Sequence, residues 1–214
     1  ALERGIIDEK FSTGVKAIDS MLTSGKGQKV GIFAGSGVGK STLMGMIVKG
    51  CEAQIKVVAL IGERGREIPE FIHYNLNNNL ENTVIVTATS DESPLMRKYA
   101  AFTAMSIAEY FRDVEKKDVL FFIDNMYRFV QAGNEVATLL GSLPSELGYQ
   151  ATLQSELSGL EDRLVSTENG SITSVQTIYV PADDISDPGV TTIMSFMDTV
   201  LVLSRQVAQR NVYP

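Results

Sequence analysis

Hydrophobic runs alternate along the chain with longer amphipathic segments. The runs are rich in β-branched residues and predict strands over residues 30–33, 55–61, 83–88, 118–124, 171–180 and 199–203. The segments between them predict helices over residues 41–49, 68–79, 94–112 and 125–140. Apolar strands that alternate with helices are typical of a parallel sheet that is buried on both faces. The pattern therefore predicts an α/β fold with a mostly parallel sheet and helices on both faces.

Residues 133–170 interrupt this alternation. Glycine or proline occurs there at positions 133, 141, 144, 148, 159 and 170. These residues disfavour long helices and strands, so we expect short helices and loops rather than a second domain. A chain of 214 residues is long enough for one large domain. We expect residues 1–214 to form a single domain.

A glycine-rich stretch, Phe-Ala-Gly-Ser-Gly-Val-Gly-Lys-Ser-Thr, occupies residues 33–42, between a predicted strand and a predicted helix. Glycines let the backbone turn tightly and direct several N–H groups at one point, which suits a phosphate group. The strict phosphate-loop pattern begins with glycine, whereas this chain has Ala34. A turn without a ligand is the less favoured interpretation. The residues predicted to bind phosphate are Gly35, Ser36, Gly37, Val38, Gly39, Lys40, Ser41 and Thr42.

Three side chains extend this prediction to a metal ion. Lys40 is expected to reach the outer phosphates, and the Ser41 hydroxyl is expected to bind Mg²⁺. Asp124 ends a buried strand and is expected to hold Mg²⁺ through water. A helix-capping role for Asp124 is the alternative, and the nearby phosphate loop favours the metal role.

Charged residues follow another strand, in the sequence Gly-Glu-Arg-Gly-Arg-Glu at residues 62–67. Glu63 is a candidate general base for water, and Arg64 and Arg66 are candidates to neutralise phosphate or orient carboxylates. By spacing alone, a solvated charged loop fits equally well. Since the phosphate loop, Glu63 and Asp124 all follow strands, we expect them to meet at one rim of the sheet.

Composition limits the other functions. The net charge of −7 argues against binding to nucleic acid or to anionic membranes, and no apolar run reaches the roughly 18 residues that cross a bilayer. The single Cys51 excludes an internal disulfide and suits a reducing compartment, so we expect a cytoplasmic location. The single His73 excludes a histidine-rich metal site and is expected on a helix surface.

Longer motifs resemble two homologous families. Residues 13–19, 27–33, 62–67, 90–97 and 108–112, together with the phosphate loop, resemble the flagellar and type III secretion export ATPases. Alanine at the first position of the phosphate loop is familiar in that family. Residues 122–129, 131–137, 148–150, 170–176 and 179–184 look like the catalytic beta subunit of rotary ATP synthases. The change in likeness suggests a chimera, a reconstructed ancestor or an uncommon natural branch.

The resemblance implies a RecA-like P-loop NTPase fold that binds ATP or ADP with Mg²⁺. It also implies roles at the matching positions. Lys40 would bind the β- and γ-phosphates, and Ser41 would bind Mg²⁺. The other implied roles are general base for Glu63, contact with the γ-phosphate region for Arg64, water ligands around Mg²⁺ for Glu67 and Asp124, a second arginine near the phosphates for Arg128, and adenine stacking for Tyr213.

Full-length relatives carry an N-terminal β-barrel and a C-terminal helical domain, which this sequence does not match. In their rings, an arginine from the neighbouring subunit completes the site, and its motif follows the segment that matches residues 213–214. An arginine finger raises turnover by roughly 10³–10⁵. We therefore expect nucleotide binding with slow or undetectable hydrolysis. Arg205 is the nearest candidate to replace this arginine, although a structural or interface role is favoured.

Two other functional classes stay under consideration. One is a nucleotide-binding module that assembles without hydrolysing ATP. The other is a recombinase-like, DNA-dependent ATPase, which the acidic charge and the lack of a basic, aromatic strand-binding loop oppose. Relatives form hexameric rings, so self-association or binding to related ring subunits is possible, and we expect a monomer or weak oligomer. Leu139, Leu140 and Leu143 would either drive association or belong to the core, and the core is favoured.

Overall fold

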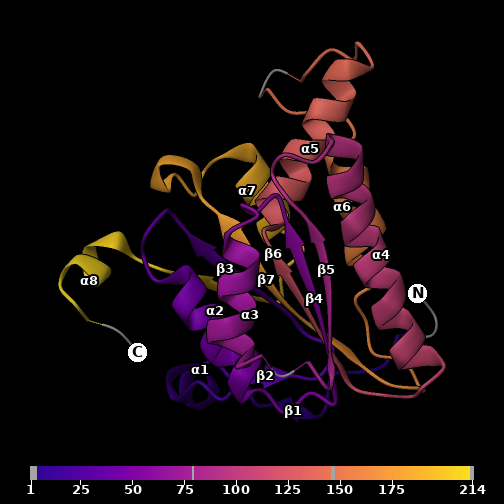
Figure 1. Ribbon diagram of the computed structural model, residues 1–214, viewed down its shortest axis with the longest axis vertical. Helices are drawn as coiled ribbons and strands as arrows, with labels where there is room; N and C mark the ends of the chain where they lie inside the picture. Colours follow the sequence, from indigo (N-terminus) through magenta and orange to yellow (C-terminus); the bar gives the residue numbers. More distant parts are fainter. Residues whose placement is uncertain (1–3, 79, 146–147, 213–214) are drawn as a thin grey trace.

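A six-stranded parallel sheet forms the centre of the molecule, in a computed structural model that describes residues 4–78, 80–145 and 148–212 (Figure 1). The strand order is β5-β4-β6-β7-β3-β8, and each neighbouring pair is parallel. A separate antiparallel pair joins β1 (Lys10–Phe11) to β2 (Ser24–Gly25). The strands of the main sheet are β3 (Lys29–Ala34), β4 (Ile55–Ile61), β5 (Thr83–Ala88), β6 (Val119–Asp124), β7 (Ile172–Tyr179) and β8 (Thr199–Val202).

Helices cover both faces of this sheet, as the sequence predicted. One face packs against α1 (Lys16–Met21), α2 (Lys40–Gly50) and α3 (Glu67–Leu76). The other packs against α4 (Pro94–Asp113), α5 (Met126–Leu139), α6 (Leu153–Glu161) and α7 (Pro188–Met194). A 3₁₀ turn, η1 (Pro181–Asp183), follows β7, and α8 (Arg205–Gln209) follows β8. Among the described residues, no helix combines the length and apolar character needed to cross a membrane.

Alternate residues of each central strand contribute to opposite hydrophobic cores. In β6, Phe121 and Ile123 join the core beneath α4 and α5, whereas Leu120 and Phe122 join the core beneath α2 and α3. All four side chains are fully buried. Burial of one such side chain contributes about 1.5–3 kcal/mol before opposing costs. These two cores make the sheet a rigid base for the loops at its carboxyl edge.

Local signals explain the helix boundaries. Pro94 occupies the first turn of α4, and the Ser93 hydroxyl accepts a hydrogen bond from the Met96 N–H at 3.3 Å. Helix α3 ends at Leu76, before the predicted end at residue 79, because Asn77 adopts a left-handed conformation with φ of 51°. Residue 79 lies outside the described residues. His73 is exposed on α3, as the sequence predicted.

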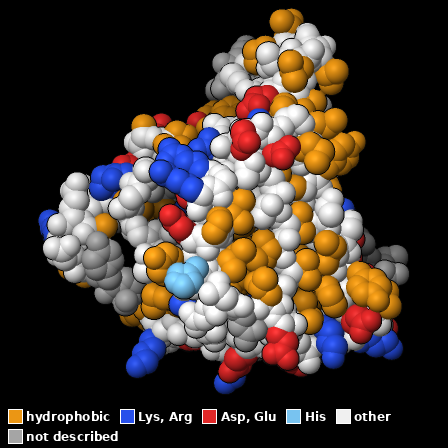
Figure 2. Space-filling view, viewed as in Figure 1, with side chains coloured by type: hydrophobic (Ala, Val, Ile, Leu, Met, Phe, Trp, Pro, Cys, Tyr) orange, Lys and Arg blue, Asp and Glu red, His pale blue; other side chains and the backbone are white. Residues whose placement is uncertain are grey.

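The expected core placement of three leucines is wrong. Leu139, Leu140 and Leu143 are 77%, 78% and 87% exposed. Helix α5 extends past the neighbouring helices, so its end has no layer to pack against (Figure 1). Figure 2 shows hydrophobic side chains on this projecting part of the molecule. Glycine and proline at positions 141 and 144 suggested a loop, but they did not show that it lies away from the sheet.

Candidate functional site

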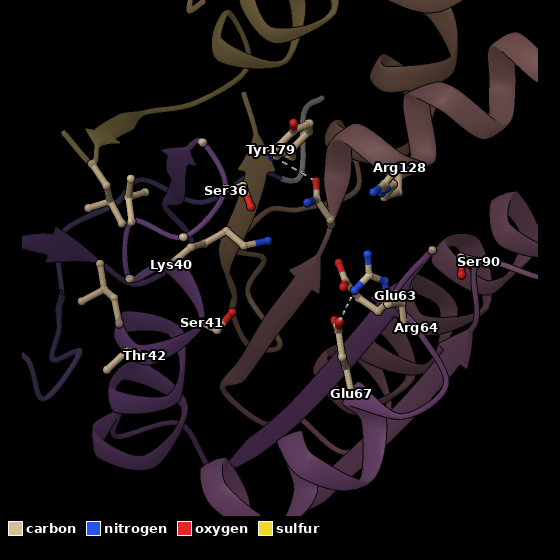
Figure 3. Close-up of a pocket in the computed structure, with 18 of the residues that line it drawn as sticks. Ser36, Lys40, Ser41, Thr42, Glu63, Arg64, Glu67, Ser90, Arg128 and Tyr179 are labelled. Carbon is tan, nitrogen blue, oxygen red and sulfur yellow. Dashed lines mark hydrogen bonds and ion pairs between the residues drawn. The ribbon is translucent and has the colours of Figure 1, made fainter. Parts of the chain in front are cut away.

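A cavity of about 990 Å³ opens at the carboxyl ends of the parallel strands. An adjoining cavity of about 650 Å³ lies between α2 and α3 and includes Asp124. The described residues that the sequence assigned to phosphate, base or metal line one or both cavities. Figure 3 shows Lys40 and Ser41 on one side, across from Glu63 and Glu67 on the other. The larger cavity is lined by residues 35–43, Met46, Gly62, Glu63, Arg64, Glu67, Ser90, Asn125, Arg128, Tyr179 and Leu203.

The glycine-rich loop connects a buried strand to a helix that begins at the cavity. Every residue of β3 is buried, which fixes the start of the loop. Gly37 and Gly39 have φ values of 74° and 94°, a region that side-chain-bearing residues avoid. Helix α2 then begins at Lys40, so its free N–H groups and the positive end of its dipole lie beside the cavity. This backbone geometry suits an anion such as phosphate.

The Lys40 side chain forms an ion pair with Asp124. Lys40 Nζ lies 2.7 Å from Asp124 Oδ1, and both side chains are largely buried. The Thr177 hydroxyl donates a hydrogen bond to the same Asp124 oxygen. Thr177 lies beside Asp124 because β6 and β7 pair in that register. The cation expected to meet phosphate and the carboxylate expected near a metal are therefore neighbours.

Glu63 follows β4 and is partly buried in the cavity wall. Gly62 precedes it with φ of 71°, and a Cβ atom there would lie 2.8 Å from the Arg128 Cβ, so the close approach requires glycine. The Glu63 carbonyl accepts a hydrogen bond from the Ser90 N–H at 2.9 Å. Burial, followed by the negative charge of Asp124, raises the pKa of Glu63 to about 8. At neutral pH the Glu63 carboxyl group is therefore protonated in most molecules.

The other charged residues of the 62–67 segment lie at the mouth of the cavity. Arg64 Nη1 lies 3.9 Å from Glu67 Oε1, and the Arg64 side chain is mostly exposed. Glu67 begins α3. Arg66, one residue earlier, is exposed and lines only the adjoining cavity. Arg64 therefore places an exposed positive charge at the cavity that Glu63 also lines.

Arg128, from α5, and Tyr179, at the end of β7, also line the larger cavity. The Arg128 guanidinium carbon lies 6.0 Å from the centre of the Tyr179 ring, and its Nη1 donates to Gln131 Oε1 at 2.8 Å. The Tyr179 N–H donates to Asn125 Oδ1 at 3.1 Å (Figure 3). The Arg128 side chain is thus held in place by Gln131 and by the Tyr179 ring. Tyr213, predicted to stack on adenine, lies outside the described residues.

The oxygen donors at the cavity suit a hydrated magnesium ion. Within the described part of the chain, no group of three or more histidine, cysteine, aspartate or glutamate side chains forms a metal cage. Ser41, Glu67 and Asp124 instead line the adjoining cavities. Magnesium commonly keeps several waters and takes only one or two protein ligands beside substrate phosphates. The donor set fits that mode of binding.

Sequence reasoning missed three residues that shape this site. Thr177 contacts Asp124, while Asn125 and Tyr179 line the cavity beside Arg128. Thr177 does not stand out in the sequence, because its strand also contains Thr173, Ser174 and Gln176. Only the order of the strands places β7 beside β6, and no local pattern in the sequence specifies that order.

The family comparison agrees with this geometry. The model of the ATP synthase alpha/beta family, nucleotide-binding domain, matches residues 14–214. The flagellum-specific ATP synthase of Helicobacter pylori strain J99 is 56% identical over all 214 residues, which make up 49% of that relative. The chain thus spans about half the length of this relative. The relative matches both the N-terminal and the C-terminal half of the chain.

Solved structures support the same assignment. An ATPase from the type III secretion system of pathogenic bacteria matches with a TM-score of 0.94 and 44% identity, over 100% of this chain and 61% of that one. The assembled ATPase EscN of enteropathogenic E. coli matches with a TM-score of 0.91 and 44% identity, over 100% of this chain and 52% of that one. The chain therefore belongs to the ATP synthase alpha/beta family and carries its nucleotide-binding domain, with the RecA-like P-loop fold that the sequence predicted.

Proposed function

We propose that this chain is a single nucleotide-binding domain that binds Mg-ATP in the large cavity and hydrolyses it slowly to ADP and phosphate. The observation that carries the proposal is the meeting of two dissimilar walls. One wall is the phosphate loop with Lys40, and the other holds Glu63 with a strongly raised pKa. A site that only bound phosphate would have no need of the second wall.

In the proposed complex, backbone N–H groups of residues 37–41 hold the phosphates. Lys40 then exchanges its 2.7 Å contact with Asp124 for contact with the outer phosphates. Ser41 binds Mg²⁺ directly, while Glu67 and Asp124 bind its water molecules. When bound, Mg²⁺ neutralises charge on the phosphate oxygens and orients them. Release of Asp124 from Lys40 thus couples phosphate binding to metal binding.

For hydrolysis, Glu63 accepts a proton from the attacking water. The water oxygen bonds to the γ-phosphorus as the bond from that phosphorus to the ADP oxygen breaks. Glu63 must be ionised to accept this proton. Because its pKa is raised, the ionised carboxylate is a stronger base than an ordinary glutamate. Arg64 and Arg128 stabilise negative charge on the γ-phosphoryl group as it passes from ADP to the water oxygen. Tyr213 stacks on adenine in the role that the family resemblance implies.

We propose that turnover increases when chains assemble. In the export and rotary families that this sequence resembles, the nucleotide lies at the interface between ring subunits, so a neighbouring chain would cover the open side of the cavity. EscN, a relative of known structure, is described as an assembled ATPase. The exposed Leu139, Leu140 and Leu143 give this chain an apolar surface suited to self-association or to related ring subunits.

Phosphate release and molecular mass, measured together across protein concentration, test this proposal. We expect turnover per chain to rise as the mass rises, and Lys40→Ala to remove the activity. Equal turnover by the wild type and Lys40→Ala would contradict the assignment of hydrolysis to this cavity. Tight ATP binding without phosphate release at any mass would instead favour a non-hydrolysing assembly module, which the exposed leucines at the end of α5 would also suit.

A further inference from the structure

An ion pair outside the cavity contacts the back of the phosphate loop. Arg205 Nε donates to Asp183 Oδ2 at 2.6 Å, and Arg205 Nη2 donates to Asp183 Oδ1 at 3.2 Å. The same Nη2 donates to the Ser36 carbonyl oxygen at 2.8 Å. The planar Arg205 guanidinium therefore contacts both the Asp183 carboxylate and the Ser36 carbonyl oxygen. Its guanidinium lowers the pKa of Asp183, which keeps that carboxylate ionised at neutral pH.

The two partners come from the strands that flank β3. Strand β7 leads into η1 with Asp183, and β8 leads to α8 with Arg205. Both connections are fixed to the end of β3, because the Val180 N–H donates to the Ala34 carbonyl and the Leu203 N–H to the Phe33 carbonyl, each at 2.9 Å. The ion pair thus closes a bridge over the point where β3 becomes the phosphate loop.

The bridge fits tightly against the loop backbone. A Cβ atom at Gly35 would lie 1.8 Å from Asp183 Oδ1 and 2.9 Å from Arg205 Nη2. Ala182 and Asp183 both have left-handed backbones, with φ values of 53° and 57°. This conformation is costly for residues other than glycine. It brings the Asp183 carboxylate against Gly35.

We propose that Arg205 and Asp183 form a clasp that positions the phosphate loop for nucleotide binding. A trans peptide directs its carbonyl and its N–H to opposite sides. When Arg205 holds the Ser36 carbonyl, the Gly37 N–H is turned away from Arg205, and this hydrogen-bond donor is set before phosphate arrives. The pair acts through the loop and does not touch the nucleotide. The inference rests on the proposed nucleotide binding and assigns these residues a positioning role.

Calorimetric titration with Mg-ATP tests the clasp in Arg205→Ala, Arg205→Lys and Asp183→Asn. We expect Arg205→Ala to weaken ATP affinity roughly tenfold, the effect of losing one charge-assisted hydrogen bond. Lysine keeps one donor for the Ser36 carbonyl and should restore part of the affinity. Asp183→Asn keeps an acceptor for Arg205 and should cost less than Arg205→Ala. Arg210→Ala is the matched control, because Arg210 is exposed just beyond the other end of α8.

Thermal unfolding of the ligand-free variants separates positioning from stability. If Arg205 has a positioning role, Arg205→Ala should bind ATP more weakly than Asp183→Asn, even where the two variants unfold at the same temperature. Equal ATP affinity in Arg205→Ala and Arg210→Ala would overturn the clasp. Affinity that falls only in step with the unfolding temperature, without recovery in Arg205→Lys, would overturn it too. Failure of the wild-type chain to bind ATP would contradict the proposed function instead.

Discussion

Different chemical groups form the two walls of the cavity. On the β3–α2 side, backbone groups and left-handed glycines form the surface, and a continuous buried strand supports them. On the β4–α3 side, carboxylate and guanidinium side chains form the surface, and Glu63 takes its raised pKa from burial and from Asp124. The first wall depends on chain geometry, whereas the second depends on charges brought together by distant strands.

This difference separates binding from chemistry. A backbone cradle recognises phosphate whatever reaction follows, because N–H groups do not change their protonation. A half-buried carboxyl group can accept or hold a proton, so it suits the reaction itself. The Lys40–Asp124 ion pair is the contact through which the two walls affect each other. Changes in the second wall should therefore reduce turnover more than binding, whereas changes in the first wall should reduce binding itself.

The largest effect is expected from Glu63→Gln, which keeps the shape of the side chain and removes the base. Turnover should fall roughly 10²- to 10⁴-fold, while ATP affinity stays within a few-fold of the wild type. Phosphate release and calorimetric binding, measured on the same preparation, check both parts. Glu52→Gln, at an exposed position remote from the cavity, is the control. Undiminished turnover in Glu63→Gln would exclude Glu63 as the base.

Lys40→Ala should have the opposite signature, with a loss of binding. Removal of a charge-assisted contact with phosphate is expected to weaken ATP affinity about 100-fold. Titration of a fluorescent ATP analogue measures this loss. Lys16→Ala changes an exposed lysine at the start of α1 that lines neither cavity and should keep wild-type affinity. Retained affinity in Lys40→Ala would refute the role of the glycine-rich loop.

The pH dependence of turnover tests the second wall without altering its shape. Because the pKa of Glu63 is raised to about 8, the carboxyl group is protonated below that pH and ionised above it. The value of kcat/KM, which reports groups in the free protein, should therefore rise about tenfold per pH unit from pH 6 and level off near pH 8. A profile that is flat over this range would show that no group with this pKa serves as the base.

Thr177→Val should give the smallest effect on ligand binding, because Thr177 only supports Asp124, the partner of Lys40. The change removes one hydrogen bond to Asp124 and keeps the side-chain shape. About 1 kcal/mol is at stake, so the Mg²⁺ concentration for half-maximal ATP binding should rise roughly fivefold. Thr173→Val provides the comparison, because Thr173 accepts a hydrogen bond from the Gly27 N–H at the far end of β7. An equal shift in both variants would indicate general loosening of the strand.

Local patterns were sufficient for most of the fold and for one wall of the site. Strands that are almost entirely hydrophobic, such as β4 and β6, lie within one residue of their predicted bounds. The phosphate loop was recognisable because its residues are adjacent in the sequence. Short helices such as α7 and α8 were not predicted, because five to seven residues hold too few turns to show a period.

The remaining features depend on contacts between distant segments. Spacing alone left Glu63 undecided between a base and a solvated loop residue, because its burial comes from elements far away in the chain. The partners Asp183 and Arg205 are 22 residues apart and meet at Ser36 only because β7 and β8 flank β3. Leu139 shows the opposite case, in which a residue expected in the core is exposed. It lies at the end of α5, beyond the helices and strands that would have covered it.

A crystal structure of this chain with Mg²⁺ and a non-hydrolysable ATP analogue tests the central claim most directly. We predict phosphate oxygens within hydrogen-bonding distance of the N–H groups of residues 37–41 and of Lys40 Nζ. We also predict that the Lys40–Asp124 contact lengthens beyond 2.7 Å and that Glu63 faces the γ-phosphate. Phosphates located away from the glycine-rich loop, with the Lys40–Asp124 pair unchanged, would contradict the account.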